Sequence, residues 1–162
     1  HYGKFSGVQN YIALVGTKGG NLDETCGYYG QQLVLRAQQL GLNTCWVGLT
    51  YRKTPDACKV GNHAKLAAVI ALGHGVSNGS PHRSKSRDAV SNAGAGMPQW
   101  FQNGVDAALL APTAMNQQKF CFSYENGTVR AKAGLGFYSK MDLGIVKYHF
   151  ELGAGKENVV WQ

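Results

Sequence analysis

The 162-residue chain is long enough for one domain with a sizeable core, and its composition of 44% hydrophobic and 15% charged residues excludes the disordered and fibrous classes. No apolar run approaches the roughly 20 residues of a membrane-spanning helix, and no secretory signal opens the chain, so no membrane partner is predicted. The net charge is +7, but the positive residues are scattered and RNA-binding aromatic signatures are absent, which argues against nucleic acid.

The first half of the chain alternates strand-like and helix-like patterns. Apolar residues at helical spacing, from Tyr29 to Leu40, predict a helix that reaches about residue 40 and ends at Gly41. Asn21 or Asp23 is a candidate for its N-cap. A short helix with Pro55 at its first position is also predicted. Apolar runs predict strands over residues 10–16 and 65–73, and a strand or an extended turn over residues 43–49.

The second half begins after a loop over residues 74–85 that is rich in Gly and Ser. Helices are predicted over residues 98–110 and 141–152, with Gly153 and Gly155 ending the second. The Asn126-Gly127 pair between strands 120–124 and 128–132 is a strong hairpin signal.

The four cysteines are Cys26, Cys45, Cys58 and Cys121, and no two of them form a CxxC pair. A zinc site or a redox dithiol is therefore not predicted. Cys26, Cys45 and Cys121 have apolar neighbours, as buried free thiols do, which favours a reducing, cytoplasmic setting.

Residues 111–118 form the first candidate for a ligand-binding segment. Pro112 ends the preceding helix, and Thr113 and Ala114 are small enough for a planar ligand to approach the backbone. Asn116 and Gln118 can each donate and accept hydrogen bonds. On these residues alone, an ordinary helix-to-strand linker is the more common interpretation.

Two further segments are candidates. Trp46, followed by Val47 and Gly48 at a strand end, could pack on a flat ring and offer a backbone N–H, although a core tryptophan is the commoner case. Arg83 and Lys85 alternate with hydroxyl residues, as in a phosphate clamp, or they belong to a solvated basic loop.

The sequence does not match several other catalytic motifs. The chain has no complete GxGxxG fingerprint opening a helix, no GxSxG elbow and no HExxH motif. His149 and Glu151 are two residues apart on a helix and point to different sides, so they are interpreted as structural. No catalytic side chain and no metal ligand is predicted.

In their order, these segments resemble the nitroreductase superfamily of FMN enzymes, and most closely its TM nitroreductase branch, whose chains carry nitroreductase-like halves in tandem. The stretches that carry the resemblance span nearly the whole chain, and they are NYIALVG, NLDETCGYYGQQLVLRAQQLGLNTCWVG, AAVIALGHG with PHRSKS, WFQNGVDAALLAPTAMNQQKFCF and MDLGIVKYHFELGAG. The resemblance implies an α+β fold with a central, mostly antiparallel sheet flanked by helices.

The order of the segments implies one nitroreductase-like domain over residues 1–162. Residues 1–85 resemble the back part of a first half, and residues 86–162 resemble the front part of a second half. The Arg-x-Ser-x-Arg stretch that usually opens the family is missing, so the chain is expected to be N-terminally truncated. A homodimer, or the missing segment of the same protein, is expected as a partner.

The resemblance also implies roles for single residues. Arg83 and Lys85 match the basic pair that holds the FMN phosphate, and Trp46, Val47 and Gly48 match the turn beside the flavin N5. Pro112, Thr113, Ala114 and Asn116 match the segment that reaches the flavin from the other half. The implied function is an FMN-dependent NAD(P)H oxidoreductase that reduces nitro compounds or similar small acceptors. A dehalogenase or ene reductase of the same family, or an inactive flavin-binding remnant, are the alternatives.

Overall fold

The computed structural model describes residues 6–51 and 58–162. The short helix predicted at Pro55 lies outside the described residues. The other predicted elements are confirmed to within three residues at either end, and one further helix, α2 (Arg87–Val90), was not predicted because four residues are too few for a periodic pattern.

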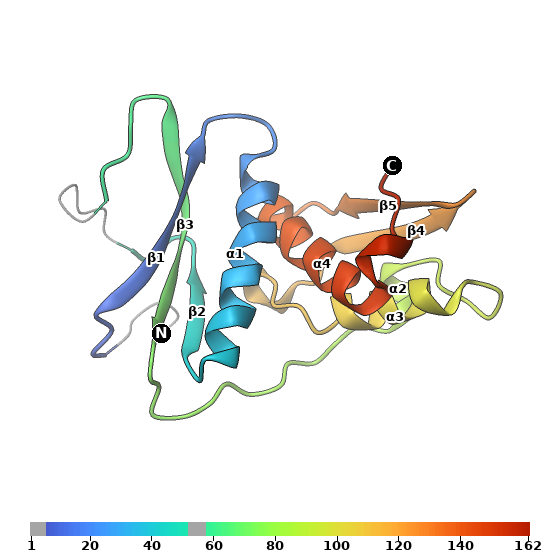
Figure 1. The fold of residues 1–162 in the computed structure, drawn as a ribbon, viewed down its shortest axis with the longest axis horizontal. Helices are drawn as coiled ribbons and strands as arrows, with labels where there is room; N and C mark the ends of the chain where they lie inside the picture. The colour runs from blue at the N-terminus through green and yellow to red at the C-terminus, as the bar shows by residue number, and fades with distance from the viewer. Residues whose placement is uncertain (1–5, 52–57) are drawn as a thin grey trace.

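A three-stranded antiparallel sheet forms one side of the molecule (Figure 1). Its strands are β1 (Asn10–Thr17), β2 (Asn43–Val47) and β3 (Ala64–Gly73), in the order β1-β3-β2. Helix α1 (Leu22–Gln39) packs against one face of this sheet. The central strand β3 is the most apolar of the three, and Ile70 at its middle is fully buried.

The other side of the molecule holds α3 (Gln99–Ala108), α4 (Ser139–Ala154) and a hairpin of β4 (Phe120–Glu125) and β5 (Thr128–Ala133). The hairpin turns at Asn126 and Gly127, whose φ angles are +51° and +82°, as the Asn-Gly pair predicts. Short 3-10 turns at Ala114–Asn116 and Lys156–Asn158 complete the described elements.

The α+β class is confirmed, but the expected single central sheet is not what the described residues form. The strands make two separate antiparallel sheets, and α1 and α4 lie between them (Figure 1). Among the described residues, the hairpin strands form isolated β-bridges with other parts of the chain at Ser91–Phe122 and Val129–Trp161. Two layers of helix therefore replace direct strand pairing across the middle of the molecule.

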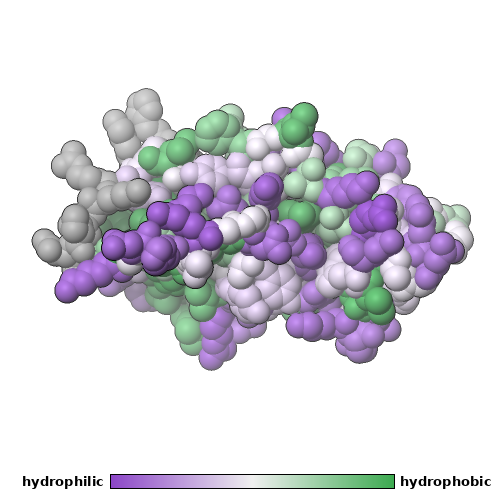
Figure 2. Space-filling view, turned by 90° about the horizontal axis from the view of Figure 1, so that it is seen from above, coloured by the Kyte–Doolittle hydropathy of each residue, from purple (hydrophilic) through white to green (hydrophobic). Residues whose placement is uncertain are grey.

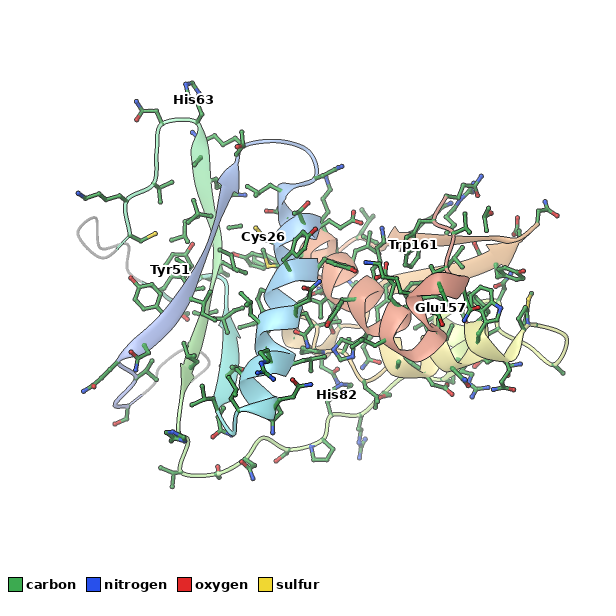
Figure 3. All side chains as sticks on the ribbon, viewed as in Figure 1. Cys26, Tyr51, His63, His82, Glu157 and Trp161 are labelled. Atoms are coloured by element: carbon green, nitrogen blue, oxygen red, sulfur yellow. The ribbon has the colours of Figure 1, made fainter. Side chains whose placement is uncertain are left out.

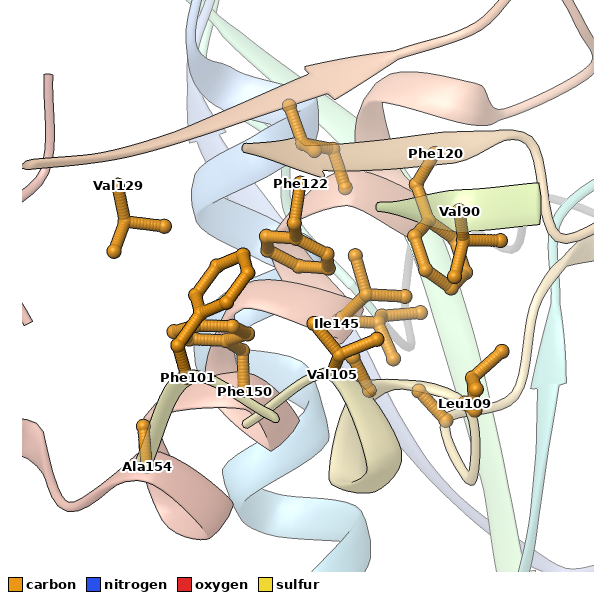
Figure 4. Packing of buried hydrophobic residues seen from close by; sticks show 14 residues of the cluster. Val90, Phe101, Val105, Leu109, Phe120, Phe122, Val129, Ile145, Phe150 and Ala154 are labelled. Carbon is orange, nitrogen blue, oxygen red and sulfur yellow. The ribbon is translucent and has the colours of Figure 1, made fainter. Parts of the chain in front are cut away.

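Two hydrophobic cores result from this arrangement. The larger lies among α3, α4 and the hairpin, where Phe101, Phe122 and Phe150 are fully buried (Figure 4). The rings of Phe122 and Phe150 are stacked with centroids 4.7 Å apart. The smaller core lies between α1 and the three-stranded sheet. Trp46 packs against both cores and so links them.

Helices α1 and α4 approach each other so closely that glycine is required at their crossing. A Cβ at Gly27 would lie 2.0 Å from the carbonyl oxygen of Met141, and a Cβ at Gly144 would lie 1.9 Å from that of Glu24. Both contacts are with backbone atoms, which cannot move aside without separating the helices. The two glycines therefore set the distance between the sheet layer and the larger core.

The cysteines differ in exposure. Cys26 points from α1 toward the three-stranded sheet and is buried (Figure 3), and Cys45 is half-buried. The expected burial of Cys121 is wrong. Its side chain points outward from β4 because it alternates with Phe120 and Phe122, which face the core.

The surface is mixed in character. In Figure 2, hydrophilic residues spread over the face shown, with smaller hydrophobic groups between them. Across residues 6–51 and 58–162, no helix combines the length and the apolar composition that crossing a bilayer requires.

Candidate functional site

A cavity of about 460 Å³ lies where the end of β2, the segment after α3 and the start of α4 meet. Its described lining is mostly apolar and consists of Trp46, Val47, Gly48, Leu49, Thr50, Ala68, Pro112, Thr113, Ala114, Met115, Phe137, Tyr138, Met141, Asp142 and Ile145. We call this cavity the central pocket.

The β2 side of the central pocket depends on Gly48. The hydroxyl of Tyr138 donates a hydrogen bond to the Gly48 carbonyl oxygen at 2.7 Å. A Cβ at position 48 would lie 2.6 Å from the Tyr138 ring, so only glycine permits this contact. Burial raises the pKa of the Tyr138 phenol, which keeps the donor protonated.

A second part of the lining is the segment from Pro112 to Met115, which leads from α3 toward β4. Three residues in and just after it have left-handed backbone: Met115, Asn116 and Gln118, with φ angles of +52°, +50° and +46°. Such angles are uncommon outside glycine and persist where surrounding contacts hold them, often at binding sites. The segment is thus a strained wall rather than a relaxed linker.

Asp142 holds this wall in place from the first turn of α4. Its carboxylate accepts hydrogen bonds from the Ala114 backbone N–H at 2.9 Å and from the Gln117 side chain at 2.8 Å. Burial raises the pKa of Asp142, and the two donated hydrogen bonds oppose that rise. Asp142 is therefore a buried carboxyl group that lines the pocket and anchors its wall.

Arg83, Lys85 and Asn116 lie outside the described lining of the central pocket. They are nevertheless tied to the end of the wall. Asn116 donates to the Arg83 carbonyl oxygen at 3.0 Å, and the Lys85 ammonium donates to the Gln118 carbonyl oxygen at 3.0 Å. The basic loop thus follows the wall segment without entering the pocket.

The structure therefore brings together six of the nine predicted site residues around one cavity: Trp46, Val47, Gly48, Pro112, Thr113 and Ala114. Sequence reasoning missed Tyr138 and Asp142. The only signal for Asp142 was an acidic residue in the first turn of a helix, three positions before Ile145 on the same face. That pattern is typical of many exposed helix starts.

The lining of the pocket is suited to a largely apolar ligand. Three large hydrophobic residues of its lining are strongly exposed, namely Leu49, Met115 and Phe137. Within the described part of the lining, Asp142 is the one charged side chain. Among the described residues, no cluster of three or more His, Cys, Asp or Glu side chains is placed to hold a metal ion.

A solved structure of "a putative nitroreductase" from Thermotoga maritima is similar to this chain, with a TM-score of 0.72 and 22% identity over 91% of this chain. The chain spans 61% of that structure's length.

A family model described as "Putative TM nitroreductase" matches residues 1–154. The chain belongs to this family. The comparison with curated proteins found no match.

Proposed function

We propose that the chain is an FMN-dependent oxidoreductase that uses NAD(P)H to reduce nitro compounds or similar small acceptors. The observation that supports this most is the meeting of Trp46, Val47 and Gly48 with Pro112, Thr113 and Ala114 around one apolar cavity of about 460 Å³. Free cysteines are consistent with a reducing, cytoplasmic compartment, which is part of the proposal.

The residues present fit a flavin. An isoalloxazine ring is flat and needs a narrow apolar slot, and small side chains at Gly48 and Ala114 leave room on two sides of the pocket. In the proposed complex these residues and Trp46 would hold the ring. Arg83 and Lys85, both exposed and next to the wall segment, would hold the phosphate.

Bound flavin would supply hydride acceptance from a nicotinamide and electron delivery to the acceptor. The protein's own part is to bind and orient the ring and to exclude water. Tyr138 keeps the turn at Gly48 closed, and Asp142 keeps the backbone of Ala114 at the pocket. The proposal assigns no proton transfer to a side chain.

The first test is flavin retention. The purified chain is incubated with FMN and desalted, and bound flavin is measured by visible absorbance. Ala114→Phe would fill the pocket and is expected to abolish retention, whereas Ala89→Phe, at an exposed position of α2, is the matched control and should retain flavin. Absence of retained flavin in the unaltered protein would overturn the proposal.

The second test separates ring binding from phosphate binding. Arg83→Ala is expected to weaken FMN binding by about tenfold, which corresponds to about 1.4 kcal/mol, and to leave binding of riboflavin, which lacks the phosphate, unchanged. Lys132→Ala, an exposed cation on β5, is the control. Equal losses for both ligands would contradict the phosphate role.

A turnover assay distinguishes the nitro-reducing enzyme from an inactive flavin-binding protein and from a dehalogenase or ene reductase. Steady oxidation of NAD(P)H in the presence of a nitroaromatic compound is expected from the flavin-loaded protein. Retained flavin without NAD(P)H oxidation would instead support the inactive flavin-binding protein. Oxidation with halogenated or enone acceptors in place of nitro compounds would support the dehalogenase or ene reductase.

A further inference from the structure

A buried chain of hydrogen bonds runs from the central pocket to α3. The indole N–H of Trp46 donates to Gln31 Oε1 at 3.1 Å, and Gln31 Nε2 lies 2.8 Å from His149 Nε2. His149 Nδ1 lies 3.2 Å from the carbonyl oxygen of Ala107. Gln31 is 1% exposed and His149 is 9% exposed, so water does not replace these contacts.

The donors and acceptors in this chain fit one arrangement. The Ala107 carbonyl can only accept, so His149 Nδ1 carries a proton and donates to it. In the neutral ring, His149 Nε2 is then an acceptor, and it accepts from the amide of Gln31. The other end of that amide accepts from Trp46. Each contact in this series of hydrogen bonds, from Trp46 through Gln31 and His149 to Ala107, then pairs a donor with an acceptor, provided that His149 is neutral.

Protonation of His149 breaks this arrangement. A proton on Nε2 would face the NH₂ group of Gln31. If the amide turned over, its NH₂ group would face the indole N–H of Trp46 instead. In either orientation two donors oppose each other, and one buried hydrogen bond is lost, at a cost of about 1–3 kcal/mol.

The charged groups on neighbouring elements are engaged elsewhere. Asp106 on α3 pairs with Arg87. On α4, Glu151 accepts from Tyr28 of α1 and from Trp161.

Lys147 on α4 pairs with Glu24 of α1 at 2.8 Å, and the ring of Tyr148 packs against that of Tyr28. The hairpin contributes Phe122 and Val129 to the core beside α4. Among the described residues, none of these carboxylates is directed at His149 to offset a positive charge. Burial accordingly lowers the pKa of His149.

The indole of Trp46 has little freedom to find another position while Gln31 holds it. It packs against both hydrophobic cores, and its ring fills the space that a Cβ at Gly30 would need, 2.4 Å away. A change at Gln31 is therefore transmitted to Trp46, which lines the central pocket.

We propose that Gln31 and His149 are positioning residues that hold the Trp46 side chain in the lining of the central pocket, and that they do so only while His149 is neutral. The pocket then responds to pH, because at acid pH the hydrogen bond from the Trp46 indole N–H to Gln31 is lost. The consequence for flavin binding rests on the proposed function, but the arrangement of Trp46 does not.

The test uses Trp46 as a reporter in the protein without flavin. Trp100→Phe and Trp161→Phe leave Trp46 as the one tryptophan of the chain, and its emission is recorded from about pH 8 to about pH 5 with circular dichroism as a check on folding. We expect one transition below pH 6.5, the ordinary histidine value, with emission shifted to longer wavelength as the indole contacts water.

Two variants distinguish positioning from a general structural role. His149→Gln keeps one acceptor and one donor but does not titrate, so the transition should disappear. Gln31→Glu should likewise remove the transition, because a carboxylate can accept from Trp46 and from the imidazolium at once, so protonation of His149 no longer brings two donors together. His82→Gln, on the exposed basic loop, is the control and should leave the transition unchanged.

A transition that persists in His149→Gln, or its absence from a folded parent protein, would overturn the inference. If the double tryptophan variant does not fold, the indole N–H resonance of Trp46, assigned with Trp46→Phe in the otherwise unaltered chain, provides the same readout by NMR. A normal transition in a protein that retains no FMN would overturn the proposed function alone. Retained FMN with a pH-independent Trp46 would overturn this inference alone.

Discussion

The side chain of Gln118 accepts a hydrogen bond from the backbone N–H of Lys85 at 2.8 Å. The same amide donates to the Arg83 carbonyl at 2.7 Å and to the Asn116 side chain at 2.8 Å. Gln118 is 3% exposed and has a left-handed backbone. It therefore joins the basic loop to the strained wall of the central pocket, two segments that are 33 residues apart.

Gln118→Ala should destabilise the protein because the Lys85 backbone N–H loses its acceptor, and the Arg83 carbonyl and the Asn116 side chain each lose a donor. The free energy of unfolding should fall by about 2–3 kcal/mol, measured by urea denaturation. Asn116→Ala is the comparison, because Asn116 is exposed and its side chain only donates to the Arg83 carbonyl and accepts from Gln118, so its effect should be the smaller of the two. Equal effects of the two substitutions would contradict the connecting role of Gln118.

Gly48→Ala should damage the pocket at the β2 turn. The new methyl group would lie 2.6 Å from the Tyr138 ring and would displace the hydroxyl from the Gly48 carbonyl. Overpacking of this kind costs about 1–3 kcal/mol, and flavin retention should fall with it. Gly73→Ala, at the end of β3 with open space around it, is the matched control. If the unfolding midpoint and the flavin retention of Gly48→Ala were both unchanged, this prediction would be wrong.

Much of the local structure could be predicted from the sequence because it depends on short-range physics. The Asn126-Gly127 turn needs positive φ at both residues, which these residue types tolerate, and the helical spacing before Gly41 is periodic over several turns. Trp46–Gly48 and Pro112–Ala114, which line the central pocket, were likewise singled out from their aromatic and small residues, whereas the basic residues Arg83 and Lys85 lie outside its described lining.

The other features of the fold and of the central pocket depend on tertiary contacts, which local sequence patterns do not encode. The positive φ of Met115 and Tyr138 is imposed by tertiary packing, since neither residue type favours it. Asp142 becomes part of the pocket only because α4 starts beside Ala114. The two sheets are separated by α1 and α4, which pack against each other. Gly27 and Gly144 permit the close contact of these helices, but the sequence does not show that the two glycines lie at one crossing.

Gly144→Ala tests this helix crossing. Its Cβ would lie 1.9 Å from the Glu24 carbonyl oxygen, so α1 and α4 would have to separate. The loss should be at the upper end of overpacking effects, about 3 kcal/mol or more, despite the better helix propensity of alanine. Gly94→Ala, which meets no atom within 4 Å, should change the thermal midpoint little. A stabilised Gly144→Ala protein would show that the helices are not held at this distance.

The pH dependence of stability should carry the signature of His149. Burial lowers its pKa below the ordinary 6.5, so between the two values the unfolded chain binds a proton that the folded chain does not. Stability is therefore complete above about pH 6.5 and is lost as the pH falls toward the folded pKa, by at most about 1.4 kcal/mol per pH unit. Urea midpoints at about pH 8, 6.5 and 5.5 should fall more steeply for the parent than for His149→Gln, which removes this one titration while the other histidines remain. Parallel curves for the two proteins would mean that His149 carries no proton-linked stability, and hence that the buried chain to Trp46 tolerates the charged ring.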